Sequence, residues 1–337
     1  MNRLSIERAG PGLALRTVST LSALLCFSAI AFAQSPATTY PTKAIRIVVP
    51  VATGGIADTS SRLIAARLTE SWGQPVIVEN RAGGGGNIGA DVIAKAPPDG
   101  YTLVMGFVGP HAVNPSLFKQ MPFDPVRDFT PVVMVMEAEG LLAVNANVVP
   151  VKSVPELIAL ARANPGKLSY SSGGIGTSSH LAGELFKSMA KVDIVHVPYK
   201  GNAPSITDLI GGQVGLSFAT MPTVLPHVKS GKLRGVAVIG SERSPAAPDL
   251  PTIGETVQGF TVNNWIGLFA PAGTPPDIVQ KLNTEVTKIM ETPEVQKRLE
   301  SEGAKFVRKS PEEFGQFQRA EIAKWSRVLK DAGIQPE

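Results

Sequence analysis

The residues that come nearest to a catalytic pair in this chain are Thr177, Ser178 and His180. A hydroxyl beside an imidazole is the usual starting point of nucleophilic catalysis, in which the histidine takes the proton and the oxygen attacks. Thr177 and His180 are three residues apart, so they would be neighbours on one turn of a helix. No acid that would orient the histidine is evident. A hydrolase therefore stays an alternative, and no catalytic residue is predicted.

Glycines and small polar residues form a second chemical pattern, which occurs three times. In each case a buried strand is expected to end in glycines and a helix to start just beyond, over residues 53–58, 106–111 and 171–178. Glycine lets the backbone approach a ligand closely, and a helix start offers free N–H groups and a positive dipole end. The three turns together favour a small anion, most simply a carboxylate. The plainer interpretation is that glycines only permit tight turns.

Motifs for other chemistry are few. Gly84, Gly86 and Gly89 match the spacing of a dinucleotide-binding loop, but the acidic residue required about 20 positions later is missing. No nucleophile elbow, phosphate-binding lysine loop or zinc-protease motif occurs. The four histidines stand singly, with no second metal ligand at helical or hairpin spacing. We therefore expect no nucleotide, no other cofactor and no metal.

Short β-rich runs that alternate with helical stretches are expected to position these turns. The clearest run is 45–49, followed by a glycine turn and a helix to about Trp72 with caps at 58–60. The alternation continues to a strand at 265–270 and two long amphipathic helices. It predicts an α/β protein with a parallel, helix-flanked sheet, and ligands bind such sheets at the carboxyl ends of the strands.

Residues 1–33 are expected to be a signal peptide. They contain three arginines, an apolar run of about 15 residues and the small-residue site Ala31-Phe32-Ala33, and the run is short of the ~20 residues that span a bilayer. Cleavage after Ala33 would remove the only cysteine, which suits an oxidising periplasm. The whole chain has 337 residues, enough for two domains, and its 43% of hydrophobic residues exclude disorder. No basic block interleaved with aromatics occurs, so no nucleic acid partner is expected.

The order of motifs after residue 39 resembles that of the Bug family, the periplasmic substrate-binding proteins of tripartite tricarboxylate transporters. The resemblance spans nearly the whole chain beyond the leader, and its motifs are ordered and specific. The matching segments are 40–50, 54–58, 78–103, 111–117, 178–186, 197–201, 225–234 and 265–275.

This resemblance implies a periplasmic-binding-protein (Venus flytrap) fold, with two α/β lobes joined by crossing hinge strands. Lobe 1 would comprise residues 40–137 and 258–337, and lobe 2 residues 138–257. A carboxylate would be held by backbone N–H groups, hydroxyls and waters, with Asp58 more a helix cap than a ligand contact. The expected ligand-binding residues are Gly54, Gly55, Asp58, Phe107, His111, Ser172, Gly174, Thr177, Ser178, Tyr199 and Ala219.

The resemblance also implies a function. We expect a monomeric receptor, not an enzyme, that captures a small organic acid in the periplasm and delivers it to the membrane permease subunits of a tripartite tricarboxylate transporter. A ligand-sensing adaptor for a membrane sensor kinase is the second alternative, beside the hydrolase. Relatives often carry an acidic residue where this chain has Ala219 and Thr220, and a buried ammonium would lack its partner here. The expected ligand is therefore an organic acid without an amino group.

Overall fold

The computed structural model of the chain describes residues 1, 40–334 and 336. Pro41–Glu337 group into one compact unit. The expected signal peptide lies, apart from Met1, outside the described residues. Among the helices that the structure describes, none is both long enough and apolar enough to cross a membrane.

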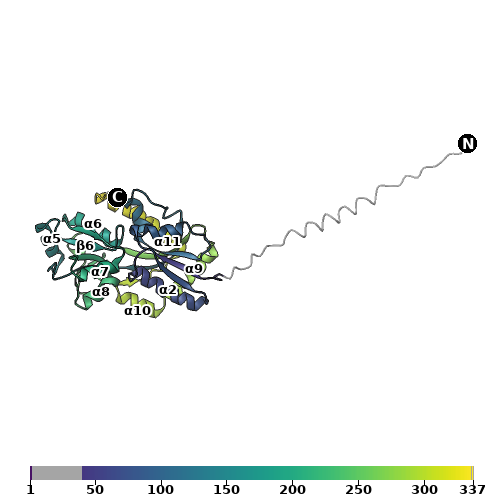
Figure 1. Cartoon of the computed structure of the whole chain (residues 1–337), viewed down its shortest axis with the longest axis horizontal. Coiled ribbons are helices and arrows are strands. Elements are labelled where there is room, and N and C mark those ends of the chain that lie inside the picture. The colour runs from purple at the N-terminus through teal and green to yellow at the C-terminus, as the bar shows by residue number, and fades with distance from the viewer. Residues whose placement is uncertain (2–39, 335, 337) are drawn as a thin grey trace. The chain divides into compact units, whose positions relative to one another are not determined.

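Two sheets organise this unit (Figure 1). One has six strands in the order β11-β4-β10-β3-β1-β2, and the other has five in the order β7-β6-β8-β5-β9. From here on, lobe 1 denotes the six-stranded sheet with its helices, and lobe 2 the five-stranded sheet with its helices. In Figure 1 the labels α5 to α8 gather on the left around lobe 2, and α2, α9 and α11 lie on the right.

The elements of lobe 1 come from both ends of the described chain. They are β1 (Ile45–Val49), α2 (Ile56–Trp72), β2 (Val76–Asn80), η1 (Gly84–Gly86), α3 (Asn87–Ala94), β3 (Thr102–Phe107), the π-helix η2 (Gly109–Val113), α4 (Asn114–Leu117), β4 (Phe129–Ala138), β10 (Asn264–Pro271), α9 (Pro276–Met290), α10 (Pro293–Ser301), β11 (Ala304–Lys305) and α11 (Pro311–Asp331).

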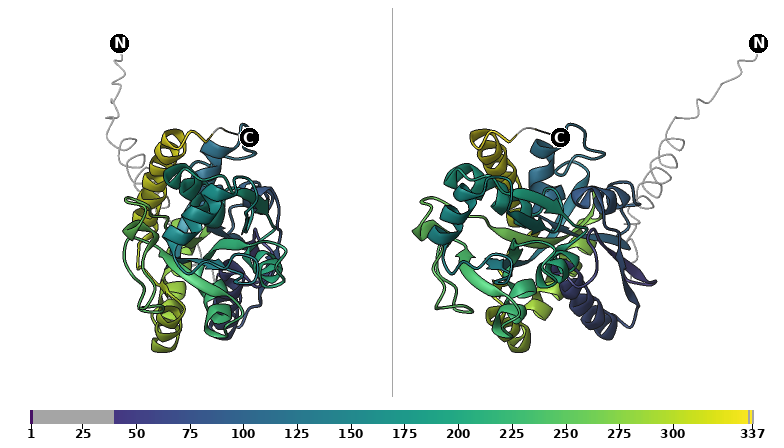
Figure 2. Two further views of the ribbon diagram at one scale, coloured as in Figure 1. Left: turned by 90° about the vertical axis from the view of Figure 1, so that its left-hand side faces the viewer. Right: turned by 60° about the vertical axis from the view of Figure 1, so that its left-hand side comes forward.

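The elements of lobe 2 come from one continuous stretch. They are β5 (Gly140–Val144), α5 (Val154–Ala163), β6 (Ser169–Ser172), α6 (Ser178–Ala190), β7 (Val195–Pro198), α7 (Asn202–Ile210), β8 (Leu216–Thr220), α8 (Met221–Lys229), β9 (Arg234–Ile239) and η3 (Ile253–Glu255). Figure 2 shows from two further directions that helices lie around the strands of both sheets.

Both sheets are mixed, so the prediction of a parallel sheet was only partly right. β1 is parallel to β2 and β3, and β6 is parallel to β7 and β8. β10 runs antiparallel to β3 and β4, and β5 runs antiparallel to β8 and β9. The antiparallel strands are those by which the chain changes sheets: Glu139 alone separates β4 from β5, and β10 brings the chain back.

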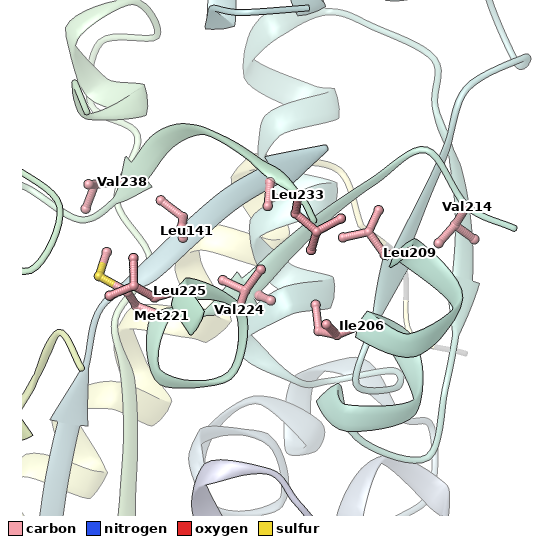
Figure 3. Close-up of a cluster of buried hydrophobic side chains, with 11 residues drawn as sticks. Leu141, Ile206, Leu209, Val214, Met221, Val224, Leu225, Leu233 and Val238 are labelled. Carbon is pink, nitrogen blue, oxygen red and sulfur yellow. The ribbon is translucent and has the colours of Figure 1, made fainter. Parts of the chain in front are cut away.

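Apolar side chains explain why these elements pack. Every residue of β1 except Arg46 is buried, and helices cover its sheet. In lobe 2, α7 and α8 pack on the five-stranded sheet through one hydrophobic cluster (Figure 3). Burial of each such large side chain stabilises the folded protein by about 1.5–3 kcal/mol. The cluster comprises Leu141, Ala143, Ile206, Leu209, Val214, Ala219, Met221, Val224, Leu225, Leu233 and Val238.

Candidate functional site

Two cavities are lined by residues of both lobes, and the one into which the predicted glycine turns project is the candidate site. Its wall contains glycines, hydroxyl and amide side chains and apolar groups, and none of the described residues that line it is charged. The lining residues are Val51, Gly55, Ile56, Ala57, Phe107, Gly173, Thr177, Ser178, Gly201, Asn202, Thr220, Asn264 and Ile266.

Four helices begin at this cavity. The N-cap residues of α2, α6, α7 and α8 are Gly55, Thr177, Gly201 and Thr220, and all four line it. Each helix directly follows a strand, so the carboxyl ends of β1, β6, β7 and β8 bring the caps together. The first N–H groups of a helix have no partner within it, and its N-terminus carries partial positive charge. The cavity is therefore built to hold an anion without a cationic side chain.

Most side-chain donors around the cavity are already bonded to protein. The Thr177 hydroxyl donates to the Gly174 carbonyl over 2.6 Å, and the Asn202 amide donates to Thr220 Oγ1 over 3.1 Å. The Ser178 hydroxyl, by contrast, has no partner among the described residues, and neither does the Nδ2 of Asn264, a residue only 7% exposed. Ser178 and Asn264 thus have hydrogen bonds to offer a ligand, and the Asn202 amide keeps a second N–H beyond the one given to Thr220.

The large apolar side chains of the lining all come from lobe 1. Val51, Ile56, Phe107 and Ile266 supply them. The Phe107 ring is confined by two glycines, because a Cβ at Gly86 would lie 2.7 Å from its Cζ and one at Gly109 2.5 Å from its Cε2. Only residues without side chains at these two positions allow the ring to lie here.

The lobes touch at several places, two of which lie next to the cavity or to its glycine turns. Near β1, the Ala52 N–H donates to the Lys200 carbonyl over 2.8 Å, and Gly54 faces the methyl group of Ala203. The second contact we call the glycine seam, defined by Gly85, Gly109, Asn114, Ile175 and Gly176. A Cβ at Gly85 would lie 2.5 Å from the Ile175 carbonyl oxygen, and one at Gly176 would overlap Asn114 Oδ1. The lobes meet there through glycine backbone and the Asn114 side chain.

Four of the predicted ligand-binding residues line the cavity: Gly55, Phe107, Thr177 and Ser178. Asp58 lies just behind it and is not the N-cap of α2, because the N-cap is Gly55, three residues earlier than Asp58. Its carboxylate accepts the Gly54 N–H over 3.0 Å and pairs with Arg62, which positions the turn at Gly54. Burial would raise the pKa of Asp58, but hydrogen bonds from Arg62, Gly54 and Asn80 outweigh it and hold the pKa low.

Ser172 and Gly174 shape the third glycine turn from behind. Ser172 Oγ accepts the Gly174 N–H over 3.1 Å and shares a 2.6 Å hydrogen bond with His196 Nε2. His180 Nδ1 accepts the Gly176 N–H over 3.2 Å, and its ring lies against that of His196. Burial lowers the pKa of His180 to about 4 and that of His196 to about 3, so both rings are neutral near pH 7.

Tyr199 also lies behind the cavity. Its N–H donates to the Ser172 carbonyl over 3.0 Å, and a Cβ on Gly174 would lie 2.8 Å from the Tyr199 carbonyl oxygen. Its hydroxyl donates to Asp208 over 2.7 Å, and burial, reinforced by that carboxylate, raises the pKa of Tyr199 to about 12. Tyr199 therefore contributes backbone to the turn.

The structure places His111 and Ala219 away from the cavity. His111 is fully buried in lobe 1, stacked on Phe269 at 4.1 Å, and neither ring nitrogen has a partner in the described part of the chain. Burial lowers its pKa to about 3. Ala219 belongs to the hydrophobic cluster of lobe 2. Successive strand residues face opposite sides, so its neighbour Thr220 reaches the cavity instead.

The catalytic alternative finds little support in this geometry. The Thr177 hydroxyl contacts the Gly174 carbonyl and the backbone N–H of His180, not the imidazole ring. Glu184, one turn after His180, accepts the Tyr170 hydroxyl over 2.7 Å. The glycines at 84–89 face protein atoms, with Gly89 against Pro50. Within the described residues, no group of three His, Cys, Asp or Glu side chains could hold a metal ion.

Several lining residues were not predicted from the sequence. Gly201 and Asn202 repeat the strand–glycine–helix pattern and could have been found by it. Thr220 precedes a helix whose first turn contains Pro222, another recognisable start signal. Asn264 and Ile266 give no local signal, because they reach the cavity only through the position of β10 between β3 and β4.

Comparison with known proteins agrees with this architecture. Residues 60–334 match the family described as tripartite tricarboxylate transporter family receptor. The chain is 36% identical over 320 residues to Protein BugT of Bordetella pertussis (strain Tohama I), covering 94% of this chain and 98% of BugT.

Two solved structures are similar throughout their length. R. palustris Rpa4515 with adipate has a TM-score of 0.86 and 41% identity, and the periplasmic binding protein BugD has a TM-score of 0.84 and 33% identity. Each match covers 88% of this chain and 100% of the other. The two mixed sheets thus form the periplasmic-binding-protein fold, as predicted. The chain belongs to the tripartite tricarboxylate transporter receptor family, and the Bug proteins are its relatives.

Proposed function

We propose that the chain is a periplasmic receptor that captures a small organic carboxylate between its lobes and delivers it to a tripartite tricarboxylate transporter permease. The observation that carries this proposal is the meeting of four helix N-termini at a cavity whose described lining has no charge. An anion gains about 0.3–1 kcal/mol from one such N-terminus at an exposed site, and more when partly buried. Together they replace the arginine that anion sites often use, and α8 contributes chiefly its dipole, because the Met221 N–H donates to the Glu139 carbonyl and Pro222 has no N–H.

The remaining donors fit the same ligand. Ser178 and Asn264 can donate to carboxylate oxygens, and hydrogen bonds to a charged group contribute about 1.5–3 kcal/mol each. Rpa4515, which is 41% identical to this chain, was solved with adipate, itself an organic acid. An amino-acid ligand is disfavoured, because its ammonium group would meet no carboxylate among the residues that line the cavity.

Capture would work by closure of the lobes. The connections at Glu139 and at the start of β10 allow the sheets to rotate, and the glycine seam forms when they meet. Delivery to a permease follows from the family of the chain. The absence of a hydroxyl–imidazole pair among the residues lining the cavity supports a receptor over an enzyme.

A ligand screen with a turnover assay tests this function. The melting temperature of the protein, purified after export, is measured in the presence of acetate, succinate, adipate, hexanoate or benzoate. The corresponding neutral amides serve as controls. A ligand at 100 times its Kd stabilises by about 2.7 kcal/mol, which raises the Tm of a chain this size by about 5 °C. We expect some acids, but none of the amides, to raise the Tm by this amount. We also expect NMR to show that the acid is chemically unchanged after incubation with the protein. Failure of every acid, or conversion of one, would refute the proposal.

A further inference from the structure

We infer that His180 is a positioning residue for ligand capture, because it orients the peptide unit by which lobe 2 meets lobe 1 at the glycine seam. The inference rests on the proposed function and adds to it a residue that does not itself line the cavity. Three observations carry it: the hydrogen bond from Gly176 to His180, the place of the Ile175 carbonyl, and the freedom of the glycine turn between them.

One ring nitrogen of His180 holds the backbone of the third glycine turn, residues 171–178. Its Nδ1 accepts the Gly176 N–H over 3.2 Å. A nitrogen that accepts a hydrogen bond carries no proton, so the proton of the neutral ring lies on Nε2. The residue is 4% exposed, and its ring centroid lies 4.4 Å from that of His196. Burial lowers the pKa of His180 to about 4, so the acceptor is available near pH 7.

The same peptide unit meets lobe 1 with its other polar atom. The Ile175 carbonyl and the Gly176 N–H belong to one planar unit, and in the usual trans form they point in opposite directions. A Cβ at Gly85 would lie 2.5 Å from the Ile175 carbonyl oxygen, so this oxygen faces the backbone of lobe 1. His180 therefore holds one side of the unit while lobe 1 receives the other. Any rotation that takes the N–H away from His180 also takes the carbonyl out of the seam.

The turn allows this unit to rotate when its N–H loses the acceptor. Gly176 is buried and has φ +79°, and glycine adopts positive and negative φ about equally readily. The neighbouring N–H groups that donate to side chains have other partners, which are Ser179 Oγ for Gly173 over 2.9 Å and Ser172 Oγ for Gly174 over 3.1 Å. A buried N–H without an acceptor is unfavourable, so we expect the Ile175–Gly176 unit alone to rotate. The rotated unit no longer fits against Gly85, and closure of the lobes becomes less favourable.

Two substitutions of His180 form a matched pair. Asparagine and leucine have nearly the same shape, but asparagine Oδ1 can accept the Gly176 N–H in place of Nδ1, whereas leucine has no acceptor. Calorimetry uses adipate, or whichever acid of the screen raises the Tm most. His180→Asn should keep the Kd within about threefold of the unaltered protein, and His180→Leu should raise it at least about tenfold. Urea unfolding without acid shows that both variants fold. Equal Kd values for the two variants overturn the inference while the proposed function stands.

A double-mutant cycle with Gly85 tests whether the effect passes through the seam. Gly85→Ala places a Cβ against the Ile175 carbonyl oxygen, so it should raise the Kd of the unaltered protein. In His180→Leu the carbonyl has already left this place, and Gly85→Ala should raise the Kd by at least about threefold less. In His180→Asn it should raise the Kd as much as in the unaltered protein. Additive effects in the leucine background mean a merely structural role for His180 and refute the inference.

The tautomer of His180 provides a readout that needs no variant. In ¹⁵N NMR of the unaltered protein at pH 7, Nδ1 of His180 should be unprotonated and Nε2 protonated. The opposite tautomer overturns the inference, because Nδ1 could then accept no hydrogen bond from Gly176. If the unaltered protein binds no acid at all, the proposed function fails, and the inference fails with it.

Discussion

Replacing Gly176 by alanine should weaken ligand binding much more than it weakens folding. The new Cβ would lie well inside the 3.0 Å that real Cβ atoms keep, against Oδ1 of Asn114. Asn114 cannot retreat, because it is fully buried and its Nδ2 donates to the Gly85 carbonyl over 3.2 Å and to Asn87 Oδ1 over 2.6 Å. The overlap lies in the glycine seam, so opening of the lobes relieves it.

The size of the effect follows from two separate costs. Gly176 has φ +79°, a conformation that costs an L-residue about 1–2 kcal/mol whether the lobes are open or closed. The overlap adds the cost of overpacking, about 1–3 kcal/mol, only when they close. The first cost lowers the free energy of unfolding. The second lowers the affinity by about 5- to 150-fold.

Gly231 provides the matched control. It has φ +74°, and nothing lies within 4 Å of a Cβ built on it. Gly231→Ala should therefore lose the same 1–2 kcal/mol of unfolding free energy in urea but change the Kd by less than about twofold. Calorimetry with the tightest acid and urea unfolding without ligand measure both quantities. Equal Kd values for the two variants would refute the argument that closure depends on the glycine seam.

The remaining predictions concern other parts of the site and the lobes behind it. Ser178→Ala should raise the Kd by about tenfold or more with an unchanged melting temperature, because a hydrogen bond to a charged group is lost; an unaltered Kd would remove Ser178 from the site. Asp58→Asn should lower the unfolding free energy by about 1–3 kcal/mol, since the Gly54 N–H and Arg62 lose their charged partner. As a control, Asp277→Asn at an exposed position in the first turn of α9 should change the unfolding free energy by less than about 0.5 kcal/mol. Stability should fall as the pH drops from 6.5 towards 4, because the unfolded chain then protonates histidines that stay neutral in the folded protein. For each of His111 and His180 the loss between pH 7 and pH 5 should be about 2 kcal/mol, and His111→Phe should reduce the measured slope; a stability independent of pH in this range would contradict the burial of these rings.

Local patterns were enough to predict the elements with strong apolar periodicity. β1 and α9 begin and end at the predicted residues, because their apolar spacing and flanking turns agree. α8 was not predicted, since Pro222 and Pro226 argue against a helix, although it tolerates both. α10 was missed because only Val295 and Leu299 of its residues are buried, too few to make an apolar stripe.

The parts of the site that could be predicted from the sequence are the helix starts, because nearby residues determine where a helix begins. The glycine turns located Gly55, Thr177 and Ser178, whose backbone conformations their own segments determine. Whether a side chain faces the cavity or the core depends on the tertiary structure. His111 and Ala219 lie on the core side for that reason, and Asn264 could be assigned only once β10 was seen between β3 and β4.

The strand order has a consequence for the sequence in which the chain can fold. Lobe 2 is continuous, so all strands of its sheet are present once residue 239 has emerged during synthesis or export. Lobe 1 has to wait, because β10 lies between β3 and β4 and begins only at Asn264. Until then β3 and β4 lack the strand that joins them, and β4 lacks the helices α9 and α11 that pack on it. The lobe whose first strands are synthesised first is thus the lobe that completes its fold last.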